Sequence, residues 1–424
     1  MAKDHTQMWK DLGLDLDGHA GLLGALGGMY RDTYLSQRGR PQAMAYWDFV
    51  LSEIHGLRVE ELLEAKRQGR KVIGTFCLYV PEELVLAVDA VCVGLCAGAE
   101  VGTSSAERVL PRNTCALIKS FMGFKLDRLC PYVEAADLVI GETTCDGKTK
   151  AYEIFGEYKP TFVLEVPNMR GDAARAYWRS EIRRLADELE KVTGRAITGA
   201  SLLAGVRVAN AKRSALQRLS VLRRADPAPI SGLDALLVAQ TSFYDDPVRF
   251  TEKLNALCDE LEERVRAGQG VAPAGTPRLL VSGCPMAAPS WKVPFVVETS
   301  GAVVVGEESC VGERGFRNLV PEGETTREGL LDAIADRYFA IDCAVFTPNP
   351  ERARHAVEMS RDLGAHGAIH YALQFCTPYQ VEGHKVGRIL QDEGIPTLRV
   401  ESDYSMEDVP QLRTRVQAFL EMIG

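Results

Sequence analysis

The chain has 424 residues, of which 46% are hydrophobic and 25% are charged, a composition typical of globular proteins with two or three domains. Its formal net charge of −9 argues against general nucleic-acid binding, which favours a basic surface. No apolar stretch reaches the ~18 residues that a membrane-spanning helix needs. The N-terminus lacks the basic segment and apolar core of a signal peptide. We therefore expect a cytoplasmic protein that binds neither nucleic acid nor membrane.

The pattern of apolar residues divides the chain into four segments. Residues 1–70 show helical periodicity, and so do residues 201–270. Residues 71–200 and 271–424 alternate short apolar runs with helical patterns, which is typical of βαβ units and a parallel sheet. We therefore predict an α/β fold with two flavodoxin-like parallel-sheet lobes and additional helical segments. The predicted order is an N-terminal helical segment, a first lobe, a helical connecting segment and a second lobe.

Individual helices and one break stand out along the chain. Residues 173–192 form an amphipathic pattern that Gly194 closes, and residues 410–422 form another at the C-terminus. Residues 207–224 and 247–267 are the helical patterns of the connecting segment. Residues 268–277 are rich in Gly and Pro, which predicts a linker before the second lobe.

Four of the predicted buried strands end beside a cysteine. The apolar runs at 72–76, 138–144, 279–283 and 368–375 lead directly to Cys77, Cys145, Cys284 and Cys376. In open α/β sheets, ligands bind just past the carboxyl ends of the strands. We therefore expect these four thiols to face a binding crevice.

The two α/β segments have the character of a diverged repeat. Residues 71–77 parallel residues 278–284, and residues 97–102 parallel residues 300–306. Cys115 lies 30 residues before Cys145, and Cys343 lies 33 residues before Cys376. Each half thus offers three thiols, which are Cys77, Cys115 and Cys145 in the first half and Cys284, Cys343 and Cys376 in the second. A cofactor in the cleft between the two lobes is the expected arrangement.

Eleven cysteines in such a chain indicate metal binding or redox chemistry rather than disulfides. Iron–sulfur cubanes are held by thiolates, whereas zinc sites usually show a close C-x₂₋₄-C pair. The only such pair, Cys92 and Cys96, lies in an apolar run, so we interpret both as core thiols. We assign Cys258 to the core and Cys130 to the start of a helix. Cys310 and Cys343 remain alternatives for one ligand position.

Residues 141–149 imitate a phosphate-binding P-loop. Five residues separate the two glycines, where the P-loop has four, and Asp146 would place a carboxylate beside the phosphate. We expect instead that Gly147 permits a tight turn and that backbone N–H groups, with Lys148, face a cluster. The alternative is that Lys148 and Lys150 are ordinary surface charges. No motif assigns a catalytic acid or base.

Several segments carry a resemblance to a known family. They are residues 74–77, 81–84, 115–119, 374–379, 394–398, 401–404 and 413–415, together with the surroundings of Cys145. With them, nearly the whole chain resembles the 2-hydroxyacyl-CoA dehydratase D-component superfamily, which includes benzoyl-CoA reductase subunits. Residues 40–41, 53–56, 94–100 and 141–148 are most similar to the double-cubane cluster proteins of that superfamily.

The resemblance implies a cofactor, partners and an activity. Double-cubane relatives carry two cubanes joined by a bridging sulfide, an 8Fe–9S unit held by about six cysteines, whereas dehydratase subunits carry one 4Fe–4S cubane on three. It further implies a homodimer and a separate ATP-hydrolysing iron–sulfur activator that delivers low-potential electrons. The candidate ligands are Cys77, Cys115, Cys145, Cys284, Cys310, Cys343 and Cys376.

We therefore expect an iron–sulfur oxidoreductase that reduces a small molecule at a double-cubane cluster. The first alternative is a 2-hydroxyacyl-CoA dehydratase or benzoyl-CoA reductase-type subunit with a single 4Fe–4S cubane, which would act as a lyase in the former case. The second is a non-catalytic iron–sulfur protein that carries electrons, stores clusters or senses redox state. The sequence leaves the physiological substrate open.

Overall fold

The computed structural model describes residues 3–424 and contains two four-stranded parallel sheets. The strand order is β2-β1-β3-β4 in the first sheet and β6-β5-β7-β8 in the second, so the two sheets share one topology. This confirms the predicted α/β fold with two flavodoxin-like lobes. The strands are β1 (Val72–Thr75), β2 (Val91–Gly94), β3 (Leu138–Glu142), β4 (Thr161–Leu164), β5 (Arg278–Gly283), β6 (Val303–Glu308), β7 (Gly367–Leu373) and β8 (Thr397–Ser402).

Helices precede, connect and cover the two sheets. Those before the first sheet are α1 (Thr6–Asp11), α2 (Leu16–Tyr30), the π-helix η1 (Arg31–Leu35), α3 (Met44–Ser52) and α4 (Leu57–Arg67). Those of the first lobe are α5 (Glu82–Ala87), α6 (Thr103–Ala106), α7 (Ala116–Leu126), α8 (Pro131–Ala135), α9 (Asp146–Phe155) and α10 (Asp172–Thr193). The connecting helices are α11 (Gly199–Leu222), α12 (Gly232–Thr241) and α13 (Pro247–Arg266). The second lobe adds α14 (Lys292–Thr299), α15 (Glu313–Phe316), α16 (Arg327–Phe339), α17 (Pro350–Asp362), α18 (Thr377–Asp392) and α19 (Val409–Ile423).

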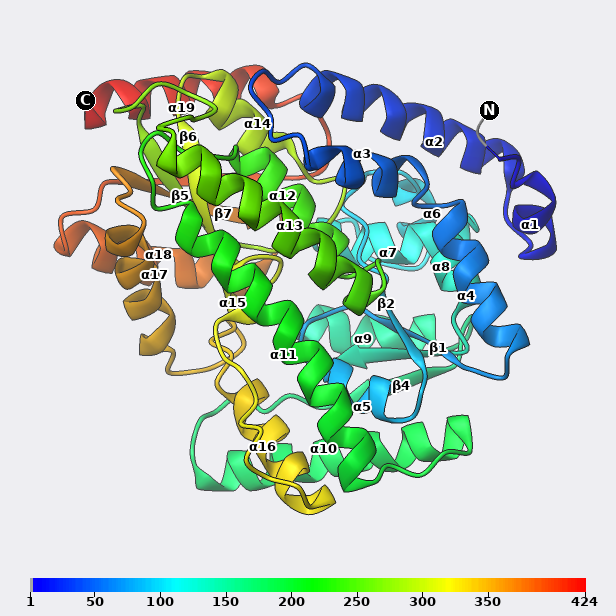
Figure 1. The fold of residues 1–424 in the computed structure, drawn as a ribbon. Coiled ribbons are helices and arrows are strands. Elements are labelled where there is room, and N and C mark those ends of the chain that lie inside the picture. Colours follow the sequence, from blue (N-terminus) through cyan, green and yellow to red (C-terminus); the bar gives the residue numbers. More distant parts are fainter. Residues whose placement is uncertain (1–2) are drawn as a thin grey trace.

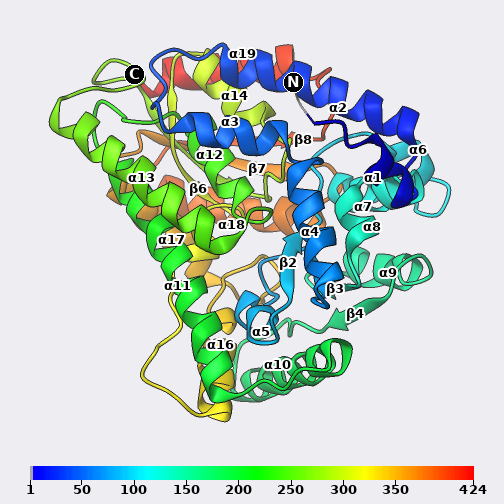
Figure 2. The ribbon, with the colours of Figure 1, turned by 45° about the vertical axis from the view of Figure 1, so that its right-hand side comes forward.

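The connecting helices tie the two lobes together. Helix α11 runs diagonally past both lobes and packs on α5 of the first and on α15 and α16 of the second (Figure 1). Helices α10 and α16 lie side by side at one end of the molecule in both views (Figure 2). Helices α10, α11 and α16 therefore hold the two lobes against each other.

Burial explains why the strands were visible in the sequence. Strands β1, β3, β5, β6 and β7 are buried along their whole length. A parallel strand covered on both faces reads as a continuous apolar run, and four of these five were recognised in that way. Strand β6 ends in Glu307 and Glu308, which are both buried. Its apolar run in the sequence therefore stops before the strand does.

The helix signals also agree with the structure. Helix α10 ends at Thr193, and Gly194 follows with a φ of 70°, a left-handed conformation that glycine adopts without strain. The C-terminal amphipathic pattern forms α19. None of the helices within residues 3–424 is both long and apolar enough to cross a membrane.

One part of the predicted repeat is wrong. Residues 97–102 follow β2 as a loop, whereas residues 303–308 form β6, so these two segments are not equivalent. The shared sheet order pairs β6 with β2 instead. The Gly-Ala similarity misled because small residues occur in both places for different reasons. At Gly98, a Cβ would lie 2.1 Å from the Ala287 carbonyl oxygen, so the loop needs a glycine for this close approach.

Candidate functional site

One cavity of about 1260 Å³ opens at the carboxyl ends of the strands of both sheets. Segments that follow β1 to β4 and β5 to β7 form its wall, so it lies between the two lobes. All seven cysteines predicted as ligands line it, which are Cys77, Cys115, Cys145, Cys284, Cys310, Cys343 and Cys376. The chain thus brings thiols separated by up to about 300 residues to one place.

Strand ends and helix starts position these thiols. Cys284 follows β5 directly, and Cys77 and Cys310 lie two residues past β1 and β6. Three others immediately precede helices, namely Cys115 before α7, Cys145 before α9 and Cys376 before α18. The free N–H groups and the positive end of the dipole at a helix start favour a thiolate there.

Four thiols form what we call the Cys376 group: Cys115, Cys145, Cys284 and Cys376. The Cys376 thiol is hydrogen-bonded to those of Cys115 and Cys284, and Cys145 lies close enough to Cys115 for their charges to interact. Two backbone N–H groups donate to sulfurs of this group. The N–H of Lys148 lies 3.4 Å from the Cys145 sulfur, and that of Leu373 lies 3.3 Å from the Cys284 sulfur.

Cys115 and Cys376, the other two members of this group, lie at helix N-caps, and their side chains accept no hydrogen bond from the helices that follow. Without metal, the hydrogen bond with Cys376 and burial still raise the pKa of Cys115 well above its usual range. The Cys115 hydrogen bond lowers the pKa of Cys376, but Cys284 and burial outweigh it, so that pKa is raised too.

Three thiols form what we call the Cys310 group: Cys77, Cys310 and Cys343. Cys77 and Cys310 are hydrogen-bonded to each other, and the Tyr379 hydroxyl lies 3.9 Å from the Cys310 sulfur and 4.0 Å from the Cys343 sulfur. The hydrogen bond with Cys77, then Arg314 and Tyr379, lower the pKa of Cys310 to about 6 against the effect of burial. Burial raises the pKa of Cys343 to about 11.

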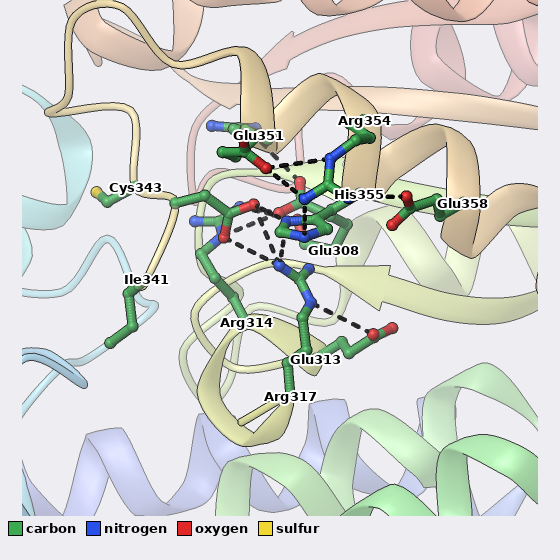
Figure 3. Close-up of polar contacts among 12 residues, drawn as sticks. Glu308, Glu313, Arg314, Arg317, Ile341, Cys343, Glu351, Arg354, His355 and Glu358 are labelled. Atoms are coloured by element: carbon green, nitrogen blue, oxygen red, sulfur yellow. Dashed lines mark hydrogen bonds and ion pairs between the residues drawn. The ribbon is translucent and has the colours of Figure 1, made fainter. Parts of the chain in front are cut away.

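A buried ion-pair network supports the Cys310 group (Figure 3). The Arg314 side chain is fully buried, pairs with Glu308 at 2.7 Å and donates to the Cys310 sulfur at 3.4 Å. Arg352 is equally buried and lies 3.5 Å from Glu308 on its other side. Because a buried charge is tolerated only when it is paired, Glu308, together with Glu382 at 2.6 Å from Arg352, compensates the two guanidinium groups behind the thiols.

The loop that carries Cys343 is anchored by the same network (Figure 3). Asp342 precedes this cysteine, and its carboxylate lies 2.7 Å from His355 Nδ1 and 3.2 Å from Arg317 Nη1. The Asn349 amide donates to the Cys343 carbonyl oxygen at 2.9 Å. The position of the Cys343 thiol is therefore set by polar contacts rather than by a strand or a helix.

Lys148 is buried in the cavity wall rather than exposed, so it is not the surface charge that one of our two interpretations assumed. Its ammonium group pairs with Glu142, which is completely buried. The expected tight turn at Gly147 is wrong, because this residue belongs to the first turn of α9. A Cβ there would lie 2.9 Å from Ile118 Cδ1, so close packing against α7 explains the glycine.

The cavity suits a cluster better than a single ion. Among residues 3–424, no three His, Cys, Asp or Glu side chains converge closely enough to hold one metal ion. The seven sulfurs instead surround a space, and soft thiolates are the ligands of iron–sulfur clusters. The backbone N–H groups of Lys148 and Leu373 and the Arg314 guanidinium donate to three of these sulfurs and would offset the negative charge of such a cluster.

Sequence reasoning missed an eighth thiol of the cavity. Cys96 lines the wall and donates to the Phe76 carbonyl oxygen at 2.6 Å. It lies two residues past β2, as Cys310 lies two residues past β6, so a correctly aligned repeat would have found it. Cys258 is buried in the core and Cys130 directly precedes α8, as expected, while Cys92 belongs to β2. Arg314, Glu308 and Tyr379 were also missed as neighbours of the thiols.

The sequence of this chain is similar to those of several known proteins. The chain is 37% identical over 365 residues to an Escherichia coli (strain K12) protein named "Putative dehydratase subunit YjiM", covering 85% of this chain and 94% of that protein. It is 26% identical to the (R)-phenyllactyl-CoA dehydratase beta subunit of Clostridium sporogenes, covering 84% and 93% of the two chains. It is 21% identical to one of the benzoyl-CoA reductase subunits of Thauera aromatica, covering 84% and 91%. The family model of 2-hydroxyglutaryl-CoA dehydratase, D-component, matches residues 77–423, and the chain therefore belongs to this family.

Proposed function

We propose that this protein is an iron–sulfur oxidoreductase that carries a double-cubane 8Fe–9S cluster and reduces a small molecule. The observation that carries the proposal is that seven cysteines line one cavity in two groups, of three and four thiols. A single cubane needs three or four thiolates, so one cluster would leave about half of these buried thiols without a ligand role.

In this proposal each cubane is held by one group. Cys77, Cys310 and Cys343 would hold one cubane, so in this proposal Cys310 and Cys343 are both ligands rather than alternatives. Three of the four thiols of the Cys376 group would hold the other. When bound, the cluster supplies low-potential electrons one at a time. The chain contributes thiolates that bind it, N–H groups that orient it, and Arg314 and Lys148, whose charges offset its own.

The partners follow from the same proposal. We propose a homodimer and a separate ATP-hydrolysing iron–sulfur activator as the electron source, both of which the resemblance to double-cubane cluster proteins implies. A separate site of ATP hydrolysis agrees with residues 141–149, whose glycine spacing differs from that of a P-loop. All eleven cysteines are free thiols, which suits the reducing conditions of the cytoplasm.

A second candidate function is a 2-hydroxyacyl-CoA dehydratase or benzoyl-CoA reductase-type subunit with one 4Fe–4S cubane. The names of the relatives favour it, since several are subunits of such enzymes. The cavity volume of about 1260 Å³ exceeds the ~300–1,000 Å³ of ordinary ligand pockets, so an acyl chain would fit beside one cubane.

Binding of a CoA thioester separates the two functions. Anaerobically purified protein is titrated with (R)-2-hydroxyglutaryl-CoA and with lactoyl-CoA by isothermal calorimetry, with free CoA as the control. The reductase proposal predicts no saturable binding of either thioester above that of CoA. Saturable binding at micromolar concentration would contradict it and support the dehydratase.

A further inference from the structure

One residue links the two groups of thiols. Tyr379 lies in the first turn of α18, three residues after Cys376. Its hydroxyl lies 3.9 Å from the Cys310 sulfur and 4.0 Å from the Cys343 sulfur. The helix that begins after Cys376 thus carries a side chain that reaches the Cys310 group.

The surroundings of Tyr379 fix the direction of its hydroxyl. Arg314 Nη1 donates to the phenol oxygen at 2.5 Å, so this oxygen already accepts a strong hydrogen bond. The hydroxyl hydrogen remains free to point elsewhere, and the two sulfurs are the acceptors within reach. The Arg352 guanidinium lies 4.5 Å from the ring centroid, and the ring of His370 contacts the Tyr379 carbonyl oxygen at 3.0 Å. Backbone, ring and hydroxyl are therefore all held in place.

The two groups differ in the donors that they receive. The Cys376 group receives the backbone N–H groups of Lys148 and Leu373, which no side-chain substitution removes. The Cys310 group receives the Arg314 guanidinium and the Tyr379 hydroxyl. Hydrogen bonds to cluster sulfurs stabilise the more negative, reduced state and so raise the reduction potential.

We propose that Tyr379 is a positioning residue that sets the potential of one cubane against that of the other. This inference rests on the proposed double-cubane function. Through its hydroxyl, Tyr379 raises the potential of the cubane on the Cys310 group. Electrons that enter the cluster then settle first beside Cys310 and Cys343.

The test is a redox titration of the Tyr379→Phe variant, followed by electron paramagnetic resonance, together with iron analysis. Loss of the hydroxyl should lower the reduction potential of one of the two one-electron transitions by about 59 mV, which corresponds to a tenfold weaker affinity for the electron. The other transition and the iron content should stay as in the wild type. Tyr132→Phe is the matched control, because this buried tyrosine donates its hydroxyl to the Ile54 carbonyl oxygen, away from the thiols.

A second variant guards against loss of the cluster from Tyr379→Phe. Replacement of Tyr379 by 3-fluorotyrosine keeps the ring and strengthens the O–H donor, so the same single transition should move to higher potential. An eight-iron protein whose two transitions are unmoved by either change, or move together, would overturn the inference alone. A wild-type protein with about four irons and one transition would instead overturn the proposed function, and this inference with it.

Discussion

The two groups of thiols share one cavity but are held by different parts of the chain. The Cys376 group lies at strand ends and at the N-termini of α7, α9 and α18, and the backbone N–H groups of Lys148 and Leu373 donate to two of its sulfurs. The Cys310 group is supported by side chains, with Arg314, Arg352 and Glu308 fully buried behind it. Two environments of such different character should give two clusters with different potentials and different sensitivity to mutation.

The comparison also shows how the repeat is used. Each group draws thiols from both lobes, since Cys77 joins Cys310 and Cys343, while Cys115 joins Cys284 and Cys376. The sequence repeat assigns three thiols to each half, but the thiols of one half do not form one group. Because the carboxyl ends of both sheets contribute to the cavity, neither group is complete until the two lobes are in contact.

The largest expected effect comes from replacing single thiols. Cys77→Ser should cost about half of the bound iron, because the Cys310 group has three thiols and none to spare. In the Cys376 group, one of the four single Cys→Ser variants should keep its full iron content, which would identify the thiol that is not a ligand. Iron is measured on anaerobically reconstituted protein, with Cys258→Ser in the core as the control. Unchanged iron in Cys77→Ser would contradict the grouping.

Glu308→Ala should break the side-chain support of the Cys310 group. It leaves the guanidinium groups of Arg314 and Arg352 buried without their shared partner, which should cost about 4–5 kcal/mol of unfolding free energy. Urea denaturation measures this loss. Glu351→Ala, which removes an exposed ion pair with Arg354, should change stability by less than about 1 kcal/mol. Equal effects of the two variants would mean that the buried network has no special role.

Lys148→Met tests whether this lysine stabilises the protein as the partner of a buried carboxylate. It leaves Glu142 buried and without its cation, so we expect a loss of about 3 kcal/mol in unfolding free energy. Lys150→Met removes an exposed ion pair with Glu153 and should stay within about 0.5 kcal/mol of the wild type. Comparable urea midpoints for both variants would mean that Lys148 contributes no more to stability than an ordinary surface lysine.

The smallest expected effect is the pH dependence of stability that His55, between α3 and α4, contributes. The rings of His19 and His55 stack at 5.0 Å, and burial, together with His19, lowers the pKa of His55 to about 3. The unfolded chain protonates this histidine at about 6.5. The stability that His55 contributes is therefore complete above about pH 6.5 and is lost as the pH falls toward 3.

Chemical denaturation at pH 7.5 and pH 5.5 measures this contribution. Between pH 7.5 and pH 5.5 the wild type should lose about 1 kcal/mol more unfolding free energy than His55→Gln. The reason is that one pH unit below the ordinary pKa corresponds to about 1.4 kcal/mol. The exposed His384→Gln should leave the pH dependence unchanged. A wild-type protein equally stable at both values would exclude a buried neutral His55.

The fold and the thiols of the cavity were largely predictable from the sequence, but their grouping was not. Apolar runs that end in Cys77, Cys145, Cys284 and Cys376 indicate parallel strands because both faces of these strands are covered. Which thiols meet depends on how the two lobes face each other, and no local pattern encodes that. The segment Glu307-Glu308-Ser309-Cys310 reads as an exposed loop, whereas Arg223 and Arg314 neutralise its carboxylates inside the protein.

The most direct test of the account is the content of iron and acid-labile sulfide per chain in anaerobically purified protein. Two cubanes joined by a sulfide predict about eight irons and about nine sulfides, one cubane for each group of thiols. About four of each would contradict the double-cubane assignment and leave one group without a cluster. Zinc, or no metal after anaerobic reconstitution, would contradict an iron–sulfur function for the cavity altogether.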